Sequence, residues 1–229
     1  MRLIICTRMK SLIENFFEIH YQLDNNVSIL NQNTTERSFD LDDDQKPNFI
    51  VRYTEGIASF TNNKCHEIQV LDYEGYITSF ANRPSFTNHR RRCDFIIEDK
   101  VGNAIILCEL TSSSHGMSGL REPREEFQGG KFEKVEKQLA DSLETLSCVP
   151  QIKDYFDSLA IKVCLCSYKL FNVSKLSPHI QSTVMAFNRY LKVEEYETGE
   201  NGAELVSKQI NDLGFVYKRI SHNYSFILT

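Results

Sequence analysis

The chain has 229 residues and a formal net charge of −5, with 41% hydrophobic and 25% charged residues. This balance excludes wholesale disorder and is typical of a globular protein. No apolar run approaches the roughly 18–20 residues that cross a bilayer, and the short apolar start is interrupted by Arg8 and Lys10, so we expect neither a membrane segment nor a signal peptide. The negative charge argues against coating nucleic acid by bulk attraction, but it allows an enzyme with a local basic groove.

In chain order, the first predicted element is a helix over residues 9–30, where apolar residues recur at three- and four-residue intervals. Residues 31–48 are polar and acidic, and they predict an exposed loop. Within it, the run Asp42-Asp43-Asp44 is either a metal site or a solvated acidic turn. Short runs of β-favouring residues follow, at 49–51, 67–71 and 76–80.

The clearest strand signal is a hairpin that joins residues 92–98 to residues 104–110, with Asp94 and Glu109 embedded in its apolar strands. If the strands pair symmetrically, Asp94 faces Glu109 on one side of the sheet, with Cβ atoms about 4.5–5.5 Å apart. Two buried carboxylates this close repel unless a cation lies between them. Hard cations such as Mg²⁺ or Mn²⁺ prefer oxygen ligands of this kind. The alternative is a shifted register, or two acids that face solvent at a sheet edge.

A Ser- and Gly-rich loop leads to the strongest predicted helix, residues 131–147. Its apolar residues fall on one compact stripe of the helix surface, formed by Phe132, Val135, Leu139, Leu143 and Leu146. One edge of this stripe carries Lys131, Lys134 and Gln138 and no acid. Beside two strand carboxylates, such an edge would supply the cations and the hydrogen-bond donor that phosphodiester cleavage requires.

A buried strand is predicted at 159–166. After it, the sequence predicts helices at 178–191 and 203–213 and a closing strand at either 215–220 or 224–228. The order of elements favours a single mixed α/β domain over residues 1–229 rather than a barrel. Its core covers about 65–167. Residues 168–229 form a C-terminal α/β extension that extends the sheet, contacts a second copy of the chain in a homodimer, or binds a partner protein.

The seven cysteines are odd in number and include no CxxC pair. Four of them lie inside apolar runs, at Cys93, Cys108, Cys164 and Cys166. Cysteines in this setting are typical of reduced, buried thiols rather than of disulfides or a zinc site. We therefore expect a cytoplasmic protein.

Three segments together resemble the PD-(D/E)xK nuclease superfamily: residues 92–97, residues 105–111, and the pattern Lys131-x-x-Lys134-x-x-x-Gln138-Leu139. The resemblance covers roughly residues 70–167 and implies a restriction-endonuclease-like αβββαβ core, with a mixed sheet flanked by helices. It implies that Asp94 and Glu109 are metal ligands, with the Leu110 carbonyl as a further ligand and Mg²⁺ or Mn²⁺ as the cofactor. It also implies nucleic acid as the substrate, DNA in preference to RNA.

The chain departs from the superfamily pattern at two positions. Cys93 replaces the proline before the aspartate, and Thr111 occupies the place of the motif lysine. Threonine carries no charge and cannot take the cationic role. Some members of the superfamily carry the lysine on the next helix instead, and the resemblance then makes Lys131 the first nominee and Lys134 the second. Gln138 resembles the helix glutamine that several branches place beside the active site. The competing interpretation is a domain that kept the fold, lost catalysis and serves as a binding or scaffold subunit.

Further contacts are predicted on either side of this core. The superfamily often takes another acid from the upstream helix, so Glu14 or Glu18 is either a third ligand or an exposed helix charge, and Glu67 and Glu74 are weaker candidates. A basic run, Arg90-Arg91-Arg92, leads into the strand that carries Asp94. This run and Lys134 predict contacts with a phosphate backbone.

No GxSxG elbow, P-loop or GxGxxG motif occurs, so the triad hydrolase, ATPase and dinucleotide-binding classes lack support. The sequence therefore predicts a metal-dependent endonuclease or exonuclease. It does not choose among defence, restriction and repair, and it leaves an RNA substrate open.

Overall fold

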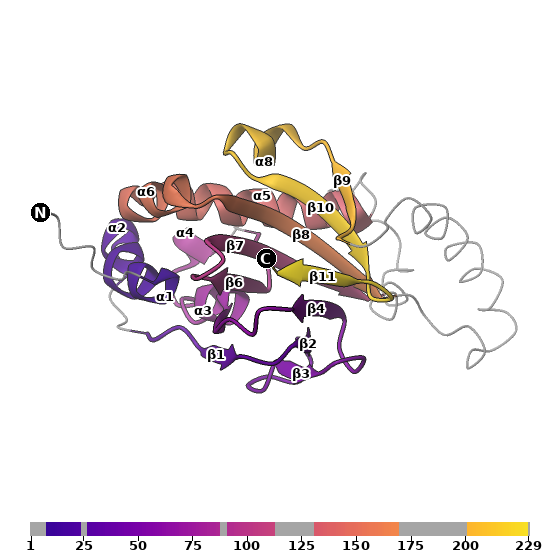
Figure 1. Ribbon diagram of the computed structural model, residues 1–229. Helices are drawn as coiled ribbons and strands as arrows, with labels where there is room; N and C mark the ends of the chain where they lie inside the picture. The colour runs from indigo at the N-terminus through magenta and orange to yellow at the C-terminus, as the bar shows by residue number, and fades with distance from the viewer. Residues whose placement is uncertain (1–7, 24–26, 88–90, 113–130, 170–200, 229) are drawn as a thin grey trace, which may run out of the picture.

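The computed structural model describes residues 8–23, 27–87, 91–112, 131–169 and 201–228. These residues form a mixed α/β fold in which a seven-stranded sheet is covered by helices on one face and by a four-stranded sheet on the other (Figure 1). None of the helices in this part of the chain combines the length and apolar composition that a membrane crossing needs.

The seven-stranded sheet is mixed. Its strands, in spatial order, are β1 (Asn31–Thr34), β5 (Ile68–Asp72), β6 (Phe95–Asp99), β7 (Ala104–Ser112), β8 (Ile161–Lys169), β10 (Val216–Ser221) and β9 (Ala203–Leu205). The pairs from β1 to β7 are antiparallel, β8 lies parallel to both β7 and β10, and β9 is antiparallel to β10. The parallel step between β7 and β8 is crossed by the helices of residues 131–158, as a parallel pair requires.

The four-stranded sheet and the helices complete the layers. The small sheet is ordered β11 (Ser225–Leu228), β4 (Ala58–Asn62), β2 (Ser38–Leu41) and β3 (Ile50–Arg52). The helices are α1 (Met9–Leu12), α2 (Glu18–Tyr21), α3 (Tyr73–Thr78), α4 (Pro84–Thr87), α5 (Lys131–Ser147), α6 (Pro150–Ser158) and α8 (Lys208–Asp212). A π-helical turn, Ile13–Phe17, connects α1 to α2.

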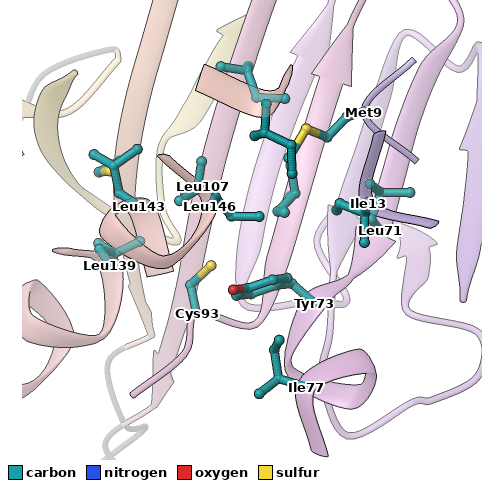
Figure 2. Close-up of a cluster of buried hydrophobic side chains, with 14 of the residues drawn as sticks. Met9, Ile13, Leu71, Tyr73, Ile77, Cys93, Leu107, Leu139, Leu143 and Leu146 are labelled. Carbon is teal, nitrogen blue, oxygen red and sulfur yellow. The ribbon is translucent and has the colours of Figure 1, made fainter. Parts of the chain in front are cut away.

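Alternation along β6 and β7 decides which side chains meet the helices. Ile96 and Leu107 are paired across the two strands and pack in the cluster that includes Leu139 of α5 (Figure 2). Ile97 and its partner Ile106 pack instead against the small sheet. Because successive strand residues point to opposite faces, a side chain two positions after Leu107 lies on the helix face.

Three predicted elements before the hairpin differ from the structure. Residues 31–48 contain β1 and β2 as well as a loop, because an edge strand such as β1 tolerates polar side chains. The N-terminal helical segment ends at Tyr21 rather than near residue 30, since Gln22 takes a left-handed conformation with φ 54°.

The third difference is at residues 76–80, which belong largely to helix α3 instead of a strand. The Asp72 carboxylate caps this helix by accepting a hydrogen bond of 2.9 Å from the Gly75 N–H. The rings of Tyr76 and Phe80, four residues apart, then meet edge to face at 5.1 Å.

In the tail, both closing strands exist: β10 extends the large sheet and β11 joins the small one. The helix predicted over 203–213 is shorter, because residues 203–205 form β9 and only Lys208–Asp212 are helical. The helix predicted at 178–191 lies outside the described residues. The four cysteines expected to be buried thiols are buried and free, namely Cys93, Cys108, Cys164 and Cys166.

Candidate active site

Asp94 and Glu109 come together at one end of the β6–β7 hairpin. The register pairs Phe95 with Cys108, so one further step places Asp94 opposite Glu109, as the symmetric hairpin predicts. Both side chains are buried, with 5% and 6% of their surface exposed. The Leu110 N–H donates a hydrogen bond of 2.6 Å to Asp94 Oδ2, which fixes the aspartate across the two strands.

The electrostatics of this pair are unfavourable for two anions. Burial raises the pKa of Asp94 to about 8, the charges of Asp43 and Glu74 act in the same direction, and the Leu110 N–H and Lys46 oppose them. Burial, followed by the charges of Asp94 and Glu74, raises the pKa of Glu109 well above its usual range. Without a cation, the site therefore retains protons at neutral pH.

Gln138 of α5 orients Glu109. Its Nε2 donates to Glu109 Oε1 at 2.5 Å and to the Arg92 carbonyl at 3.1 Å. The other carboxylate oxygen, Glu109 Oε2, is buried and has no hydrogen-bond partner among the described residues. A buried acceptor without a partner costs about 1–3 kcal/mol, and a divalent cation is the kind of ligand that would satisfy it.

Helix α5 also holds the segment that precedes Asp94. Burial raises the pKa of Asp141, and the charge and the backbone N–H of Arg91, with which this aspartate interacts, oppose the rise. The Cys93 N–H donates a hydrogen bond of 2.7 Å to Ser142 Oγ. Gln138 also contacts Arg92, as described above. Gln138, Asp141 and Ser142 are three or four residues apart on one face of α5, and together they bind this helix to the start of β6.

Replacing Ser142 by alanine is expected to lower the free energy of unfolding by about 1–2 kcal/mol, because the buried Cys93 N–H loses its acceptor. Urea unfolding measures this change. Ser147→Ala, at the half-buried end of α5, is the matched control and is expected to change stability by less than about 0.5 kcal/mol. Equal stability of the two variants would contradict this role for Ser142.

The structure brings two more groups near the hairpin end: Glu74, which the sequence offered as a weaker candidate than Glu14 or Glu18, and Lys46, which it did not nominate. Glu74, in the first turn of α3, lies beside Asp94, since the N–H groups of Tyr73 and Glu74 approach the Asp94 carbonyl at 3.0 and 3.2 Å. Lys46, in the loop between β2 and β3, contacts Asp72 and Glu74. The Asp-x-x-Gly cap at Asp72, followed by two aromatic residues four apart, is the sequence signal that could have revealed α3 and hence Glu74.

Other nominated residues lie elsewhere or are only partly described. Glu18 is buried and accepts hydrogen bonds from the Val27 N–H at 3.1 Å and the Tyr76 hydroxyl at 3.3 Å. Glu14 accepts from Ser28 Oγ at 2.5 Å and pairs with a lysine one turn earlier. No contact among the described residues joins either acid to Asp94 or Glu109.

The basic candidates divide in the same way. Lys134 is exposed, and its positive charge opposes the rise in the pKa of Glu109. It therefore acts electrostatically on this acid. Lys131 begins α5, but its side chain lies outside the described residues, as does the whole of Arg90. Thr111, at the motif lysine position, is buried on β7.

Asp42, Asp43 and Asp44 gather their carboxylate oxygens within 4.8 Å of one another. The Asp44 N–H donates a hydrogen bond of 2.9 Å to Asp42 Oδ1, which is the pattern of a local turn. Exposed acidic turns are common without an ion, so this cluster does not establish a metal site. Its link to the hairpin is electrostatic, through the effect of Asp43 on Asp94.

The hairpin end thus offers two buried carboxylates, a neighbouring backbone carbonyl, a third acid and nearby lysines. These are the donor types that hard divalent cations prefer, and Glu109 Oε2 is left without a protein partner in the described residues. In comparisons with known proteins, no protein-family model, no curated protein and no solved structure matches the chain.

Proposed function

We propose that the protein is a Mg²⁺- or Mn²⁺-dependent nuclease that hydrolyses phosphodiester bonds of DNA. The observation that carries this proposal is the buried pair Asp94 and Glu109, whose pKa values are both raised. In addition, Glu109 Oε2 lacks a hydrogen-bond partner in the described residues. Protein interiors tolerate two such carboxylates when a cation neutralises them. Perturbed carboxylates that converge with unused donor capacity are typical of functional sites.

The order of elements supports the finer fold assignment, a restriction-endonuclease-like αβββαβ core. An N-terminal helix precedes the antiparallel strands β5, β6 and β7, and α5 then leads to the parallel strand β8. In this assignment the paired acids stand at the start of the second core strand and near the end of the third. The free, buried thiols suit a reducing compartment, so we place the protein in the cytoplasm.

The chain's own residues divide the work of cleavage. Asp94 and Glu109 would hold the cation, with the Leu110 carbonyl beside them, and Gln138 keeps Glu109 in one rotamer through its hydrogen bond. A bound divalent cation supplies a nucleophile by lowering the pKa of a water and offsets charge on the scissile phosphate. Lys134, with Lys131, would attract the phosphate backbone, and Arg91 and Arg92 extend the positive charge along the entry to β6.

The direct test is cleavage of end-labelled DNA and RNA by the purified full chain, with Mg²⁺ or Mn²⁺ and with chelator. We expect DNA cleavage that depends on the added metal and stops in chelator, and slower cleavage of RNA of matched sequence. A preference for RNA would redirect the substrate and leave the metal chemistry intact. Calorimetry with Mn²⁺ gives an independent measure of metal binding.

A protein that binds no Mn²⁺ and cleaves neither polymer would instead be a nuclease-fold scaffold or binding subunit of a larger nucleic-acid-processing complex. The feature that favours this second candidate is Thr111, a buried neutral residue where the superfamily pattern has lysine.

A further inference from the structure

Lys46 lies in the loop between β2 and β3 of the small sheet, yet its ammonium contacts acids at the end of β5 in the large sheet and at the start of α3. Lys46 Nζ lies 3.0 Å from Asp72 Oδ1 and 3.3 Å from Glu74 Oε2. It also stands 5.7 Å from the centre of the Phe95 ring, the residue that follows Asp94. The ammonium is therefore held at the boundary of the two sheets, beside the end of β5 and the start of β6.

The anchor of this ammonium is rigid. Asp72 is 5% exposed, ends β5 and accepts a hydrogen bond of 2.9 Å from the Gly75 N–H. A Cβ atom at Gly75 would lie 2.1 Å from Asp72 Oδ2, so only glycine allows this close approach. Lys46 is consequently placed by a buried, capped carboxylate rather than by a mobile surface pair.

The ammonium keeps capacity for another ligand. A lysine has three N–H donors, and among the described residues Asp72 and Glu74 are the hydrogen-bond partners found for Lys46. Its side chain is 28% exposed, so Lys46 is in part open to solvent. Burial alone would lower the pKa of Lys46, but Asp72 and Glu74 outweigh it and raise the pKa, so the group carries its positive charge at neutral pH.

We propose that Lys46 is a substrate-binding residue of the candidate site and donates a hydrogen bond to a non-bridging oxygen of the DNA phosphate that enters beside Asp94. The inference rests on the proposed nuclease function and names the cation that Thr111 does not supply at the hairpin. Lys46 Nζ is 3.3 Å from Glu74 Oε2, and the Glu74 N–H in turn lies 3.2 Å from the Asp94 carbonyl, so the ammonium stands next to the segment that carries Asp94. Asp72 and Glu74 preorganise the ammonium, which lowers the entropic cost of a phosphate contact.

The test is binding of a fluorescently labelled DNA duplex by the full chain, followed by anisotropy across a salt series with Ca²⁺ in place of Mg²⁺ and again in chelator. Lys46→Met is expected to weaken binding about 5- to 10-fold and to reduce the slope of log K against log salt by about 0.9, the loss of one phosphate contact. Lys46→Arg keeps the charge and is expected to retain the wild-type slope. Lys64→Met, an exposed lysine before the opposite end of β5, is the control and should leave the slope unchanged.

If Lys46 is only a structural counter-ion of Asp72 and Glu74, Lys46→Met should lower the thermal stability but bind DNA with the wild-type salt slope. That result overturns the inference. If Lys46→Met does not fold, Lys46→Gln, which keeps a donor for Asp72 without the charge, decides in the same assay. Wild-type protein that neither binds nor cleaves DNA removes the proposed function and this inference together. Wild-type protein that cleaves DNA while Lys46→Met and Lys46→Gln bind as it does removes this inference alone.

Discussion

Replacing Glu109 by glutamine is expected to lower metal-dependent cleavage at least about 100-fold while leaving the metal-free protein as stable as the wild type or more so. Glutamine has nearly the same shape, and its side-chain oxygen can still accept the hydrogen bond from Gln138 Nε2. The substitution removes the negative charge that burial and Asp94 make unfavourable. It also removes an anionic oxygen that would bind the cation.

The opposite signs of the two effects make the prediction specific. Substitutions at buried positions usually destabilise a protein. Removal of Glu109 is instead expected to stabilise the metal-free form by about 1–3 kcal/mol at neutral pH and above, because the folded wild type must keep this carboxyl protonated while the unfolded state releases the proton. Urea unfolding in chelator measures the stability, and calorimetry with Mn²⁺ measures the loss of metal affinity. If Glu109 is a metal ligand whose burial costs stability, this one variant should show both a higher stability without metal and a lower affinity for Mn²⁺.

Glu144→Gln provides the matched control, because Glu144 is an exposed carboxylate on α5. We expect it to keep wild-type cleavage, metal affinity and stability. Undiminished cleavage by Glu109→Gln would show that Glu109 is no metal ligand, whatever happened to the stability.

The hairpin could be predicted from sequence because its information is local. Alternating and continuous apolar residues on both sides of a short turn fix the register, and that register alone sets Asp94 opposite Glu109. The position of Gln138 follows from the period of α5, since it borders the same stripe as Leu139, which is buried. The sequence therefore predicted the pair of acids and the donor that orients one of them.

The rest of the site depends on contacts between distant segments, which local patterns do not encode. Lys46 belongs to a polar stretch that resembles a plain loop, and its partner Asp72 is 26 positions later in the sequence. The sequence ranked Glu74 below Glu14 and Glu18 and did not predict its place beside Asp94, because the β-favouring aromatic residues after it predicted a strand. The Asp72 cap and the packing of Tyr76 produce a helix instead. The mixed α/β class with helices on a multi-stranded sheet was predicted, but the second sheet was not, because β2, β4 and β11 are separated by long stretches of chain.

The stability of the metal-free protein is expected to fall as pH rises from 6 to 8, with Asp94 as one of the groups responsible. In the folded state Asp94 holds its proton up to a pKa of about 8, whereas an exposed aspartate has lost it near pH 4. Between these values the folded state binds more protons than the unfolded state, so the free energy of unfolding decreases with pH. One extra proton corresponds to a slope of about 1.4 kcal/mol per pH unit.

Asp94→Asn removes one of the two carboxyls with a raised pKa and is expected to reduce the slope by the share of one proton, while Glu109 still contributes. Wild type and variant should then be close in stability at pH 6, and the variant should be the more stable by about 2–3 kcal/mol at pH 8. Urea unfolding in chelator at half-unit pH steps measures both curves. The Leu110 N–H can still donate to the asparagine side-chain oxygen, so the backbone contact is retained. A wild-type curve parallel to that of Asp94→Asn across this range would mean that Asp94 titrates as an ordinary exposed acid.

Adding Mn²⁺ should reverse the trend in the wild type alone. Metal binding stabilises the folded state in proportion to the logarithm of the metal concentration over its Kd, and it competes with the protons that the acidic pair retains, so metal affinity is expected to rise with pH. The wild-type thermal midpoint should therefore increase more with Mn²⁺ at pH 8 than at pH 6, whereas Asp94→Asn should respond weakly at both. A shift of equal size in wild type and variant would place the cation elsewhere, and the acidic turn at residues 42–44 would be the next position to test by neutralising Asp43.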